Sequence, residues 1–466
     1  MKIDDLKGKK ITVMGLGLHG GGIGTVRFLV WAGAKVIVTD LKSKEDLAPS
    51  LEKLKDLKGV EYVLGQHRTE DFTQADMVIK TPSASWTNKH IKMALEKKIP
   101  VEIDSSLFFK LCQNPIIGVT GTRGKTTTAS LIYEILKAAD KNPVKVGVGQ
   151  IAVLDKLQDL KKDNMVIFEL SSWRLSALGR YKLSPHVAVI TNIFPDHLNY
   201  YKSMADYIAD KKNIFLNQRT TDVCVINHDN EILREMESEV RSEMIKFSTG
   251  KISNGRTVYI DDGMIYLNNG IDDKKVIAVA EAKLRGAHNL GNILASIGAA
   301  QAMGVSIPDM KKAVSEFKGL PHRLEFVREL DGVKYYNDTA ATSPEGAIAG
   351  LHSFTEPIIL IAGGSDKKLD MAELGKHIFA KTKGVIFLKG EATEKIIAAM
   401  KKLTPLGAPE PEYAVIDSME QAVEMATLSA QPGDVILLSP GASSFGLFAN
   451  EIARGNKFKE IVKALI

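Results

Sequence analysis

The sequence predicts an α/β protein built from three domains, with more than one doubly wound sheet. Short apolar runs rich in Val and Ile alternate with helix-like stretches along most of the chain. Many of these runs end in Gly, Ser, Thr, Asp or Asn, as buried parallel strands do when the loops at their carboxyl ends carry function. At 466 residues the chain also exceeds one ordinary core, and about 150 residues per domain suggests three domains. The runs expected as strands are Ile11–Gly15, Lys35–Asp40, Met77–Lys80, Pro115–Gly121, Met165–Leu170, His186–Asn192, Val223–Asn227, Pro357–Gly364, Gly384–Gly390 and Asp434–Gly441.

Two breaks divide the chain into three parts. Lys110–Pro115 separates a first α/β unit from a glycine-rich loop, and Phe317–Arg323 separates a helical region from a third α/β unit. The segment Gly250–Ala280 combines turn residues with alternating apolar residues, which predicts a small antiparallel insertion. We expect a Rossmann-like N-terminal domain, a central domain with a P-loop ATPase-like parallel sheet, and a Rossmann-like C-terminal domain. Their expected bounds are 1–113, 114–318 and 319–466.

Composition and charge exclude several classes of protein. Apolar residues make up 44% of the chain and charged residues 25%, as in ordinary globular proteins, and the net charge is +5. So small a charge on a long chain gives no case for a nucleic-acid partner. Cys112 and Cys224 stand far apart, without metal-type spacing, which favours a reducing cytoplasm. The polar N-terminus predicts no signal sequence, and the absence of a long apolar run predicts no membrane insertion.

The first glycine-rich loop has the spacing of a nucleotide-binding turn. Gly15, Gly17 and Gly20 form G-x-G-x-x-G between a predicted strand and a predicted helix, and Asp40 ends the next strand. Such glycines let the backbone approach phosphates at a helix N-terminus. A nicotinamide site, a site for another nucleotide or diphosphate, and a packing role all remain open from the spacing alone.

The second glycine-rich loop lies in Ile116–Leu136 and also reads as strand, turn and helix. Its turn ends in Gly124, Lys125 and Thr126, as a P-loop does. In the usual pattern the first glycine stands six residues before the lysine, where this chain has Val119, and Gly118 lies one residue farther upstream. The strand–turn–helix context still predicts that the loop amides and the lysine bind phosphates.

Polar side chains follow two further predicted strands. Glu169 ends one apolar run, and Asp196 and His197 come just after another. Carboxylate and hydroxyl oxygens suit Mg²⁺, so Glu169 and Thr126 are candidate ligands. His197 is a candidate for a second cation, with Asp196 as its polar support.

Four motifs of this central region resemble those of the Mur ligases, which make peptidoglycan precursors, and of their folylpolyglutamate synthase relatives. They are GVTGTRGKTTT, FELSSW, TNIFPDH and GAHNLGN, in that order. The resemblance continues through GLPHRLEFV, YYNDTAATSPEG, IAGGSDKKLD and SPGASSFGLFANEIARG, and so covers essentially the whole chain. The family's phosphate loop has the longer form G-x-x-G-x-x-G-K-[ST]-T, which Gly118, Gly121 and Gly124 fit.

The resemblance implies an ATP-dependent amide ligase that works through an acyl phosphate. The first unit is most similar to that of the family members that join D-glutamate to UDP-N-acetylmuramoyl-L-alanine, so these two molecules are the implied substrates. A cytoplasmic monomer is implied as well. One alternative is another Mur-type amino-acid ligase. A second, from another class, is a nicotinamide-dependent dehydrogenase, which leaves the loop around Lys125 unexplained.

The resemblance also implies roles for particular residues. Lys125, Lys211 and His197 are the implied catalytic residues, and Lys211 matches the lysine that the family carbamylates with CO₂, with Lys212 as the alternative. The implied ligands of Mg²⁺ or Mn²⁺ are Thr126, Glu169, His197 and Lys211. The residues implied at ATP are Gly121, Thr122, Arg123, Gly124, Lys125, Thr126, Thr127, Asn289, Asn292, Arg323 and Asp338.

Two further sets are implied at the other substrates. The residues implied at the UDP-linked acceptor are Gly15, Leu16, Gly17, Leu18, His19, Asp40, Leu41, Lys42, Gln150, Ser171 and Arg174. Those implied at D-glutamate are Thr342, Lys367, Ser444 and Phe445. The sequence departs from the family pattern at Ala340, Arg174 and Gln150, where lysine, glutamine and asparagine are usual. These departures concern substrate and phosphate contacts and leave the ATP and metal residues in place.

Overall fold

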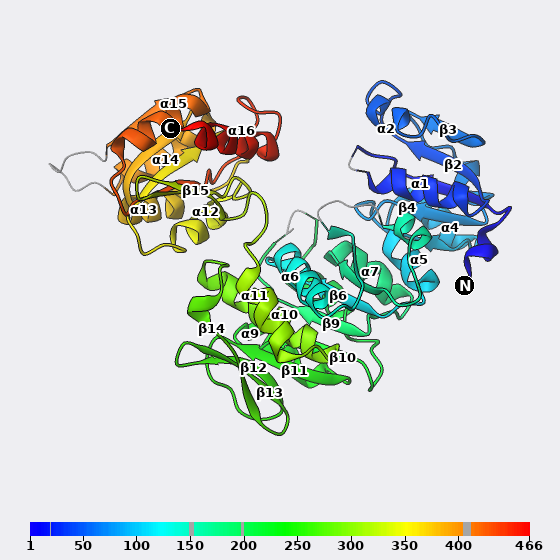
Figure 1. Ribbon diagram of the computed structural model, residues 1–466. Helices are drawn as coiled ribbons and strands as arrows, with labels where there is room; N and C mark the ends of the chain where they lie inside the picture. Colours follow the sequence, from blue (N-terminus) through cyan, green and yellow to red (C-terminus); the bar gives the residue numbers. More distant parts are fainter. Residues whose placement is uncertain (19, 149–152, 197–199, 404–411) are drawn as a thin grey trace. The chain divides into compact units, whose positions relative to one another are not determined.

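The computed structural model describes residues 1–18, 20–148, 153–196, 200–403 and 412–466. The chain forms two compact units (Figure 1). The first unit contains Met1–Val279 and Gly291–Val314, and the second contains Ala280–Leu290 and Ser315–Ile466. The first unit holds two sheets and the second holds one.

The first sheet is entirely parallel, with the strand order β3-β2-β1-β4-β5. This is a doubly wound order, and the direction of winding reverses between β1 and β4, where such sheets bind ligands. Its strands are β1 (Lys10–Met14), β2 (Lys35–Asp40), β3 (Val60–Leu64), β4 (Met77–Lys80) and β5 (Val101–Glu102). Its helices are η1 (Ile3–Leu6), α1 (Gly21–Trp31), α2 (Ala48–Glu52), α3 (Thr69–Thr73), α4 (Lys89–Glu96) and α5 (Asp104–Leu111).

The central sheet has the order β14-β13-β12-β11-β10-β9-β6-β8-β7. It is parallel from β7 through β12, and only β13 and β14 run antiparallel to their neighbours. The predicted antiparallel insertion therefore extends the edge of this sheet. Its strands are β6 (Ile116–Thr120), β7 (Pro143–Val146), β8 (Met165–Glu169), β9 (Val187–Ile190), β10 (Val223–Asn227), β11 (Glu243–Ser248), β12 (Arg256–Asp261), β13 (Met264–Asn269) and β14 (Asp273–Ala278).

Helices accompany the central strands along the chain. They are α6 (Lys125–Ala138), η3 (Leu154–Gln158), α7 (Ser172–Arg180), α8 (Met204–Lys212), α9 (Glu231–Met236), η4 (Glu237–Glu239), η5 (Val279–Glu281), α10 (Ala287–Ala302) and α11 (Ile307–Glu316). One continuous apolar core joins the first two sheets, because side chains from α1, α5 and η3 pack into it together with those of β6 and β8. Through this core, the ends of strands from both sheets are held in one body.

The third sheet has the order β15-β16-β20-β17-β18-β19 and is parallel except for the β15–β16 pair. Its strands are β15 (Glu325–Leu330), β16 (Val333–Asn337), β17 (Ile358–Gly363), β18 (Thr382–Leu388), β19 (Tyr413–Ile416) and β20 (Val435–Leu438). Its helices are α12 (Pro344–Leu351), α13 (Ala372–Lys381), α14 (Glu391–Lys401), α15 (Met419–Ser429) and α16 (Glu451–Ala464). The two clusters of apolar side chains on this sheet come from its opposite faces, as in other doubly wound folds.

The predicted α/β class, with mostly parallel sheets, is confirmed. Each of the ten apolar runs contains a strand of the structure. Strands such as β3 and β19 escaped the prediction, and both are short and only partly buried. None of the described helices combines the length and the apolarity that crossing a bilayer requires.

Candidate active site

The loop between β6 and α6 has the close geometry of a phosphate-binding turn. Gly124 precedes α6 with a φ of 83°, in the left-handed region that favours glycine. A Cβ at Gly124 would lie 2.1 Å from Oδ1 of Asn292, and a Cβ at Gly121 would lie 1.9 Å from Oγ1 of Thr191. Both positions therefore need glycine, so that the backbone can turn tightly into the helix, whose N-terminus is the kind of place that binds anions.

The upstream glycine has a different place. Gly118 lies inside β6, between Phe168 of β8 and Ala188 of β9. A Cβ there would lie 2.7 Å from Cγ of Pro185 and 2.9 Å from Cδ1 of Leu170. In this chain, the glycine seven residues before Lys125 serves strand packing, and the phosphate turn itself begins at Gly121.

Two predicted metal ligands meet at this loop. Oγ1 of Thr126 donates to Oε2 of Glu169 at 2.9 Å. Nζ of Lys125 donates to the carbonyls of Gly121 and Thr122 at 2.9 and 3.0 Å, so the ammonium lies over the turn. The strand ends of β6 and β8 are adjacent, which is why residues 43 positions apart come together.

Lys211 reaches the same loop from α8 and is 2% exposed. Its Nζ donates to the carbonyl of Gly121 at 2.9 Å and to Oγ1 of Thr120 at 3.4 Å. Burial, and then the nearby charge of Lys125, hold the pKa of Lys211 well below its usual range, against the opposing charge of Asp196. Lys212 instead forms an ion pair with Glu239 and is 23% exposed.

The remaining residues predicted at ATP are in varied settings. Within the first unit, Oδ1 of Asn292 accepts from Oγ1 of Thr128 at 3.2 Å, behind the loop. Arg123 is exposed, and its backbone N–H donates to Oδ1 of Asn192 at 2.9 Å. In the second unit, Nδ2 of Asn289 donates to the carbonyl of Arg285 at 2.6 Å. Three residues predicted at the other sites lie outside the described residues: His19 and Gln150, predicted at the acceptor, and His197, predicted at the metal.

A cavity of about 480 Å³ opens at the carboxyl ends of β1, β2 and β4, at the reversal point of the first sheet. Six of the residues predicted at the UDP-linked acceptor line it, namely Gly15, Leu16, Gly17, Leu18, Asp40 and Leu41. Lys42, Ser171 and Arg174 are not among its lining residues. Ser171 caps α7, where its Oγ accepts from the backbone N–H of Arg174 at 3.3 Å.

Asp40 organises the glycine loop through its own carboxylate. Oδ2 accepts from the backbone N–H groups of Leu16 and Gly17 at 2.9 and 3.1 Å, and Oδ1 accepts from that of Lys42 at 3.0 Å. Three such bonds satisfy most of the hydrogen-bonding capacity of the carboxylate and stabilise its charge. The amides of Leu16 and Gly17 are therefore already bonded within the loop.

Sequence reasoning missed two charged residues that line the cavity. Lys80 ends β4 and is 2% exposed, and its Nζ donates to the carbonyl of Ala84 at 2.8 Å. Burial lowers the pKa of Lys80 to about 8. Asp104 begins α5 and pairs with Arg174 from α7, at 2.7 Å between Oδ2 and Nη2. A lysine closing the apolar run of β4 was the available signal for Lys80, whereas no local pattern marks Asp104.

In the second unit, the predicted D-glutamate residues lie on neighbouring loops at strand ends. Nζ of Lys367 donates to Oγ1 of Thr342 at 2.9 Å, and burial lowers the pKa of Lys367. Ser443 pairs with Ser365 through backbone hydrogen bonds, which brings the loop of Ser444 and Phe445 beside the loop of Lys367.

Arg323 and Asp338 occupy adjacent positions in this unit. Asp338 directly follows β16. Its Oδ1 accepts from the N–H of Leu324 at 3.1 Å, and its Oδ2 accepts from Oγ of Ser439 at 2.8 Å. Its burial raises the pKa of Asp338 to about 7. Arg323 is exposed between His322 and Leu324, whose φ angles of 68° and 45° turn the chain outward at this point.

Comparison with known protein families agrees with this geometry. Residues 9–102 match the Mur ligase MurD-like N-terminal domain, residues 119–300 the Mur ligase middle domain, and residues 322–441 the Mur ligase glutamate ligase domain. The chain belongs to the Mur ligase family. The phosphate turn, Glu169 and Lys211 all fall in the segment that matches the Mur ligase middle domain.

Several curated Mur ligases are similar over nearly their whole length. A protein of Roseiflexus sp. named UDP-N-acetylmuramoylalanine–D-glutamate ligase is 41% identical, over 98% of this chain and 99% of that protein. A protein of the same name from Clostridium tetani is 38% identical, over 98% of this chain and 97% of that protein. Another, from Clostridium botulinum strain Kyoto, is 37% identical, over 99% of this chain and 98% of that protein.

Solved Mur ligase structures share the fold. UDP-N-acetylmuramate-alanine ligase from Thermotoga maritima has a TM-score of 0.59 at 20% identity. The match covers 98% of this chain and 99% of that one. MurF ligase from the same organism, solved with ADP, has a TM-score of 0.59 at 17% identity, covering 99% of this chain and 97% of its own. At this identity the similarity concerns the three-domain α/β architecture.

Proposed function

We propose that this chain is an ATP-dependent ligase that joins D-glutamate to UDP-N-acetylmuramoyl-L-alanine in the synthesis of peptidoglycan precursors. The observation that carries the proposal is the 41% identity, from end to end, with a relative of that name. The phosphate turn, with Thr126 bonded to Glu169 beside the buried Lys211, supplies the chemistry that such a ligase needs.

The reaction forms one amide bond and releases ADP and phosphate. The terminal carboxylate of the acceptor attacks the γ-phosphorus of ATP, which gives an acyl phosphate and ADP. The amine of D-glutamate then attacks the acyl carbon, loses a proton and expels phosphate. Charge neutralisation and alignment account for most of such catalysis. We assign the phosphate contacts to the loop from Gly121 to Thr127, through backbone amides at the start of α6 and the ammonium of Lys125.

We assign a divalent cation, Mg²⁺ or Mn²⁺, to Thr126 and Glu169, with His197 as a further predicted ligand. A hydroxyl that donates to a carboxylate at 2.9 Å is a donor set that fits a hard cation, which would use oxygens of both groups. When bound, the cation would neutralise charge on the phosphates. Thr126 and Glu169 would fix its place relative to the loop.

We propose that Lys211 is carbamylated by CO₂. The free amine attacks the carbon of CO₂ and loses a proton, which leaves an anionic carbamate. This requires the neutral amine, and the burial that lowers the pKa of Lys211 favours that form. The anion would lie near the phosphate turn, because Nζ already contacts Gly121.

We propose that the three predicted domains divide the substrates. Residues 1–113 would bind the UDP-linked acceptor in the 480 Å³ cavity, residues 114–318 would bind ATP, and residues 319–466 would bind D-glutamate through Thr342, Lys367, Ser444 and Phe445. Arg323 and Asp338 would contact the phosphates and ribose of ATP. A lysine beside a hydroxyl is a suitable pair for a carboxylate. A cytoplasmic monomer is part of the same proposal.

Phosphate release from ATP tests the proposal directly. The purified chain is incubated with ATP, Mg²⁺ and each pairing of several UDP-muramoyl acceptors with several amino acids. Release that requires both UDP-N-acetylmuramoyl-L-alanine and D-glutamate is the expected result. Release with a different amino acid would identify another Mur-type specificity, and no release together with tight NADH binding would identify a dehydrogenase.

A further inference from the structure

The cavity of the first sheet contains an electrostatic difficulty. A UDP-linked acceptor carries a diphosphate and a carboxylate, so it is strongly anionic. Two carboxylates, Asp40 and Asp104, nevertheless line the cavity. Like charges in a partly buried site repel one another strongly, because the low effective dielectric constant screens them poorly. Each carboxylate must be compensated before an anion can bind beside it.

The two carboxylates are compensated in different ways. Asp40 is stabilised by three backbone N–H groups of its own sheet. Asp104 receives the guanidinium of Arg174, with Nη2 at 2.7 Å from Oδ2 and Nε at 3.4 Å from Oδ1. The pair is largely buried, at 9% and 16% exposure of the two side chains. The charge on Asp104 is thus neutralised from outside the first sheet, by a residue that does not line the cavity.

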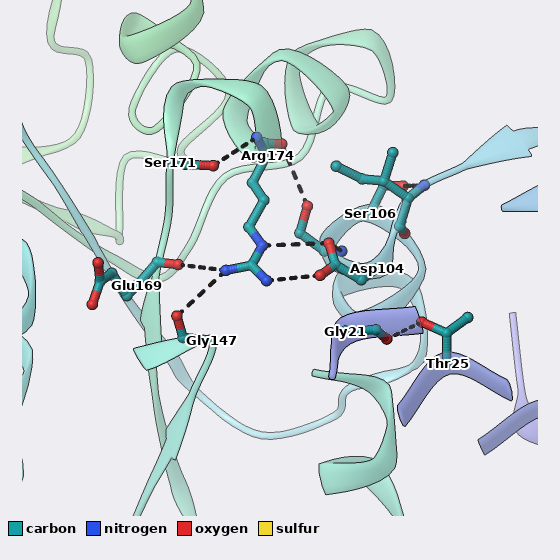
Figure 2. A network of polar contacts seen from close by, with 10 residues as sticks. Gly21, Thr25, Asp104, Ser106, Gly147, Glu169, Ser171 and Arg174 are labelled. Carbon is teal, nitrogen blue, oxygen red and sulfur yellow. Dashed lines mark hydrogen bonds and ion pairs between the residues drawn. The ribbon is translucent and has the colours of Figure 1, made fainter. Parts of the chain in front are cut away.

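Arg174 is held firmly in this position. Figure 2 shows its guanidinium between the carboxylate of Asp104 on one side and two backbone carbonyls on the other. Nη1 donates to the carbonyls of Glu169 and Gly147 at 3.3 and 3.4 Å. The guanidinium also lies over the ring of Phe168, 5.5 Å from its centroid. These contacts fix the cation against the central sheet, so it cannot follow a ligand into the cavity without giving them up.

A second cation near Asp104, Lys80, is already bonded to backbone carbonyls. Lys80 lines the cavity, but its Nζ donates to the carbonyls of its own loop, the shortest of these bonds being 2.8 Å to Ala84. The same ammonium lies 4.4 Å from the ring centroid of Trp86. Arg174 is therefore the cation with a direct ion pair to Asp104 among the described residues.

We propose that Arg174 is a positioning residue for the acceptor, which it serves by neutralising Asp104 so that an anionic UDP-linked molecule can occupy the cavity. The proposal rests on the proposed acceptor site in the first sheet. It gives Arg174 an indirect role, acting through Asp104, in place of the direct substrate contact that the sequence implied. Removing the cation alone should harm acceptor binding, and removing the carboxylate as well should restore it.

Four variants of the full chain test this coupling: Arg174→Gln, Arg174→Lys, Asp104→Asn and the double variant Arg174→Gln/Asp104→Asn. Arg174→Gln should raise KM for the acceptor about tenfold, with a smaller change in kcat, because an unpaired carboxylate faces the ligand. Arg174→Lys should recover part of this loss. Asp104→Asn should lower KM, because the cation of Arg174 is then unopposed near an anionic ligand. The double variant should return KM to within about threefold of its original value.

The matched control is Arg27→Gln. Arg27, in α1 of the first sheet's layer of helices, pairs with Asp56 at the surface through two contacts of 2.9 Å and does not line the cavity. Its loss should leave KM unchanged. Thermal unfolding of every variant shows whether it is folded. A double variant no better than Arg174→Gln would mean that the pair merely joins the two sheets, and would overturn the proposal, as would an unchanged KM in Arg174→Gln.

Calorimetric binding of UDP-N-acetylmuramoyl-L-alanine to the same variants separates this proposal from the proposed reaction. A chain that binds the acceptor without turning it over contradicts the reaction. In that case weaker binding in Arg174→Gln, restored in the double variant, would still support the role of Arg174. Equal binding by all variants would overturn it.

Discussion

Lys211 shows how burial prepares a single side chain for chemistry. Lys211 is 2% exposed, and among the described residues its ammonium bonds to a carbonyl and a hydroxyl and to no carboxylate; a charge there is costly, so the neutral amine is favoured. The contact between its Nζ and the carbonyl of Gly121 fixes where any group added to that nitrogen must lie. The same contact would be lost if the lysine were shortened.

Replacing Lys211 by alanine should reduce ligase activity about a hundredfold or more, because the proposed carbamate anion disappears from the phosphate turn. Short carboxylates such as acetate should restore part of the activity, since they can enter the space left by the side chain and supply an anion. The measurement is the rate of phosphate release with and without about 0.1 M acetate.

Lys212→Ala is the matched control for this variant. Lys212 is the next residue and pairs with Glu239 at the surface, away from the turn. It should retain nearly full activity and show no response to acetate. Full activity in Lys211→Ala would show that no carbamate at this position is needed, and rescue seen only in Lys212→Ala would move the modification to that residue.

Asp338 makes a separate prediction about stability and pH. Its pKa is raised to about 7 by burial, compared with about 4 in an unfolded chain. Between these values the folded chain keeps a proton that the unfolded chain has released. Stability should therefore fall as the pH rises from about 4 to 7, by at most about 4 kcal/mol, and should then level off.

Urea unfolding of the second unit at pH 5 and pH 8 measures this effect, with Asp338→Asn as the reference. Burial also lowers the pKa of His322, which titrates with the opposite sign, so the quantity to compare is the difference between the two proteins. The native chain should lose more stability than Asp338→Asn between these pH values. Equal losses would show that Asp338 is already ionised at pH 5.

At the scale of single elements, β6 explains the unusual spacing of the phosphate loop. The strand lies in the interior of its sheet, between β8 and β9, and a Cβ at Gly118 would lie too close to Pro185 and Leu170. The sequence pattern alone could not separate this packing glycine from the glycines of the turn, since both precede the same lysine.

Gly118→Ala should therefore destabilise the chain by about 1–3 kcal/mol, because the new methyl group would lie within 3 Å of Pro185 and Leu170. The midpoint of thermal unfolding measures this. Gly384→Ala is the control, since Gly384 also lies in a strand, β18, and has no atom within 4 Å of an added Cβ. A midpoint unchanged in Gly118→Ala would mean that the strand shifts to accept the methyl group.

What the sequence predicted, and what it did not, follows from the range of the interactions. Glu169 was found because it stands at the end of an apolar strand, and Thr126 because it follows the lysine of the glycine-rich turn; the parallel pairing of β6 with β8 brings the two together. Asp104 and Arg174 could not be paired in advance, because 70 residues separate them and their contact depends on how α5 packs on α7. The sequence also did not predict that β12 joins the central sheet, because no local sequence pattern marks its parallel pairing with β11.

At the scale of the whole molecule, the cavity proposed for the acceptor lies entirely in the first unit. Its lining residues run from Val13 to Asp104, at the reversal point of the first sheet. The phosphate turn belongs to the same unit but to the central sheet, and the predicted D-glutamate residues belong to the second unit. Ligands that bind at these three sites should therefore protect different backbone amides from hydrogen exchange.

UDP alone should slow amide exchange in residues 13–18 and 79–84, which line the cavity, and should leave residues 342–367 unchanged. ADP is the control, because it should instead protect residues 121–128 around the phosphate turn. Asp40→Ala should speed exchange at Leu16 and Gly17 even without ligand, since their amides lose their acceptor. Protection by UDP that appears at the phosphate turn but not in the first sheet would place the uridine diphosphate outside the cavity and contradict the proposed division of substrates.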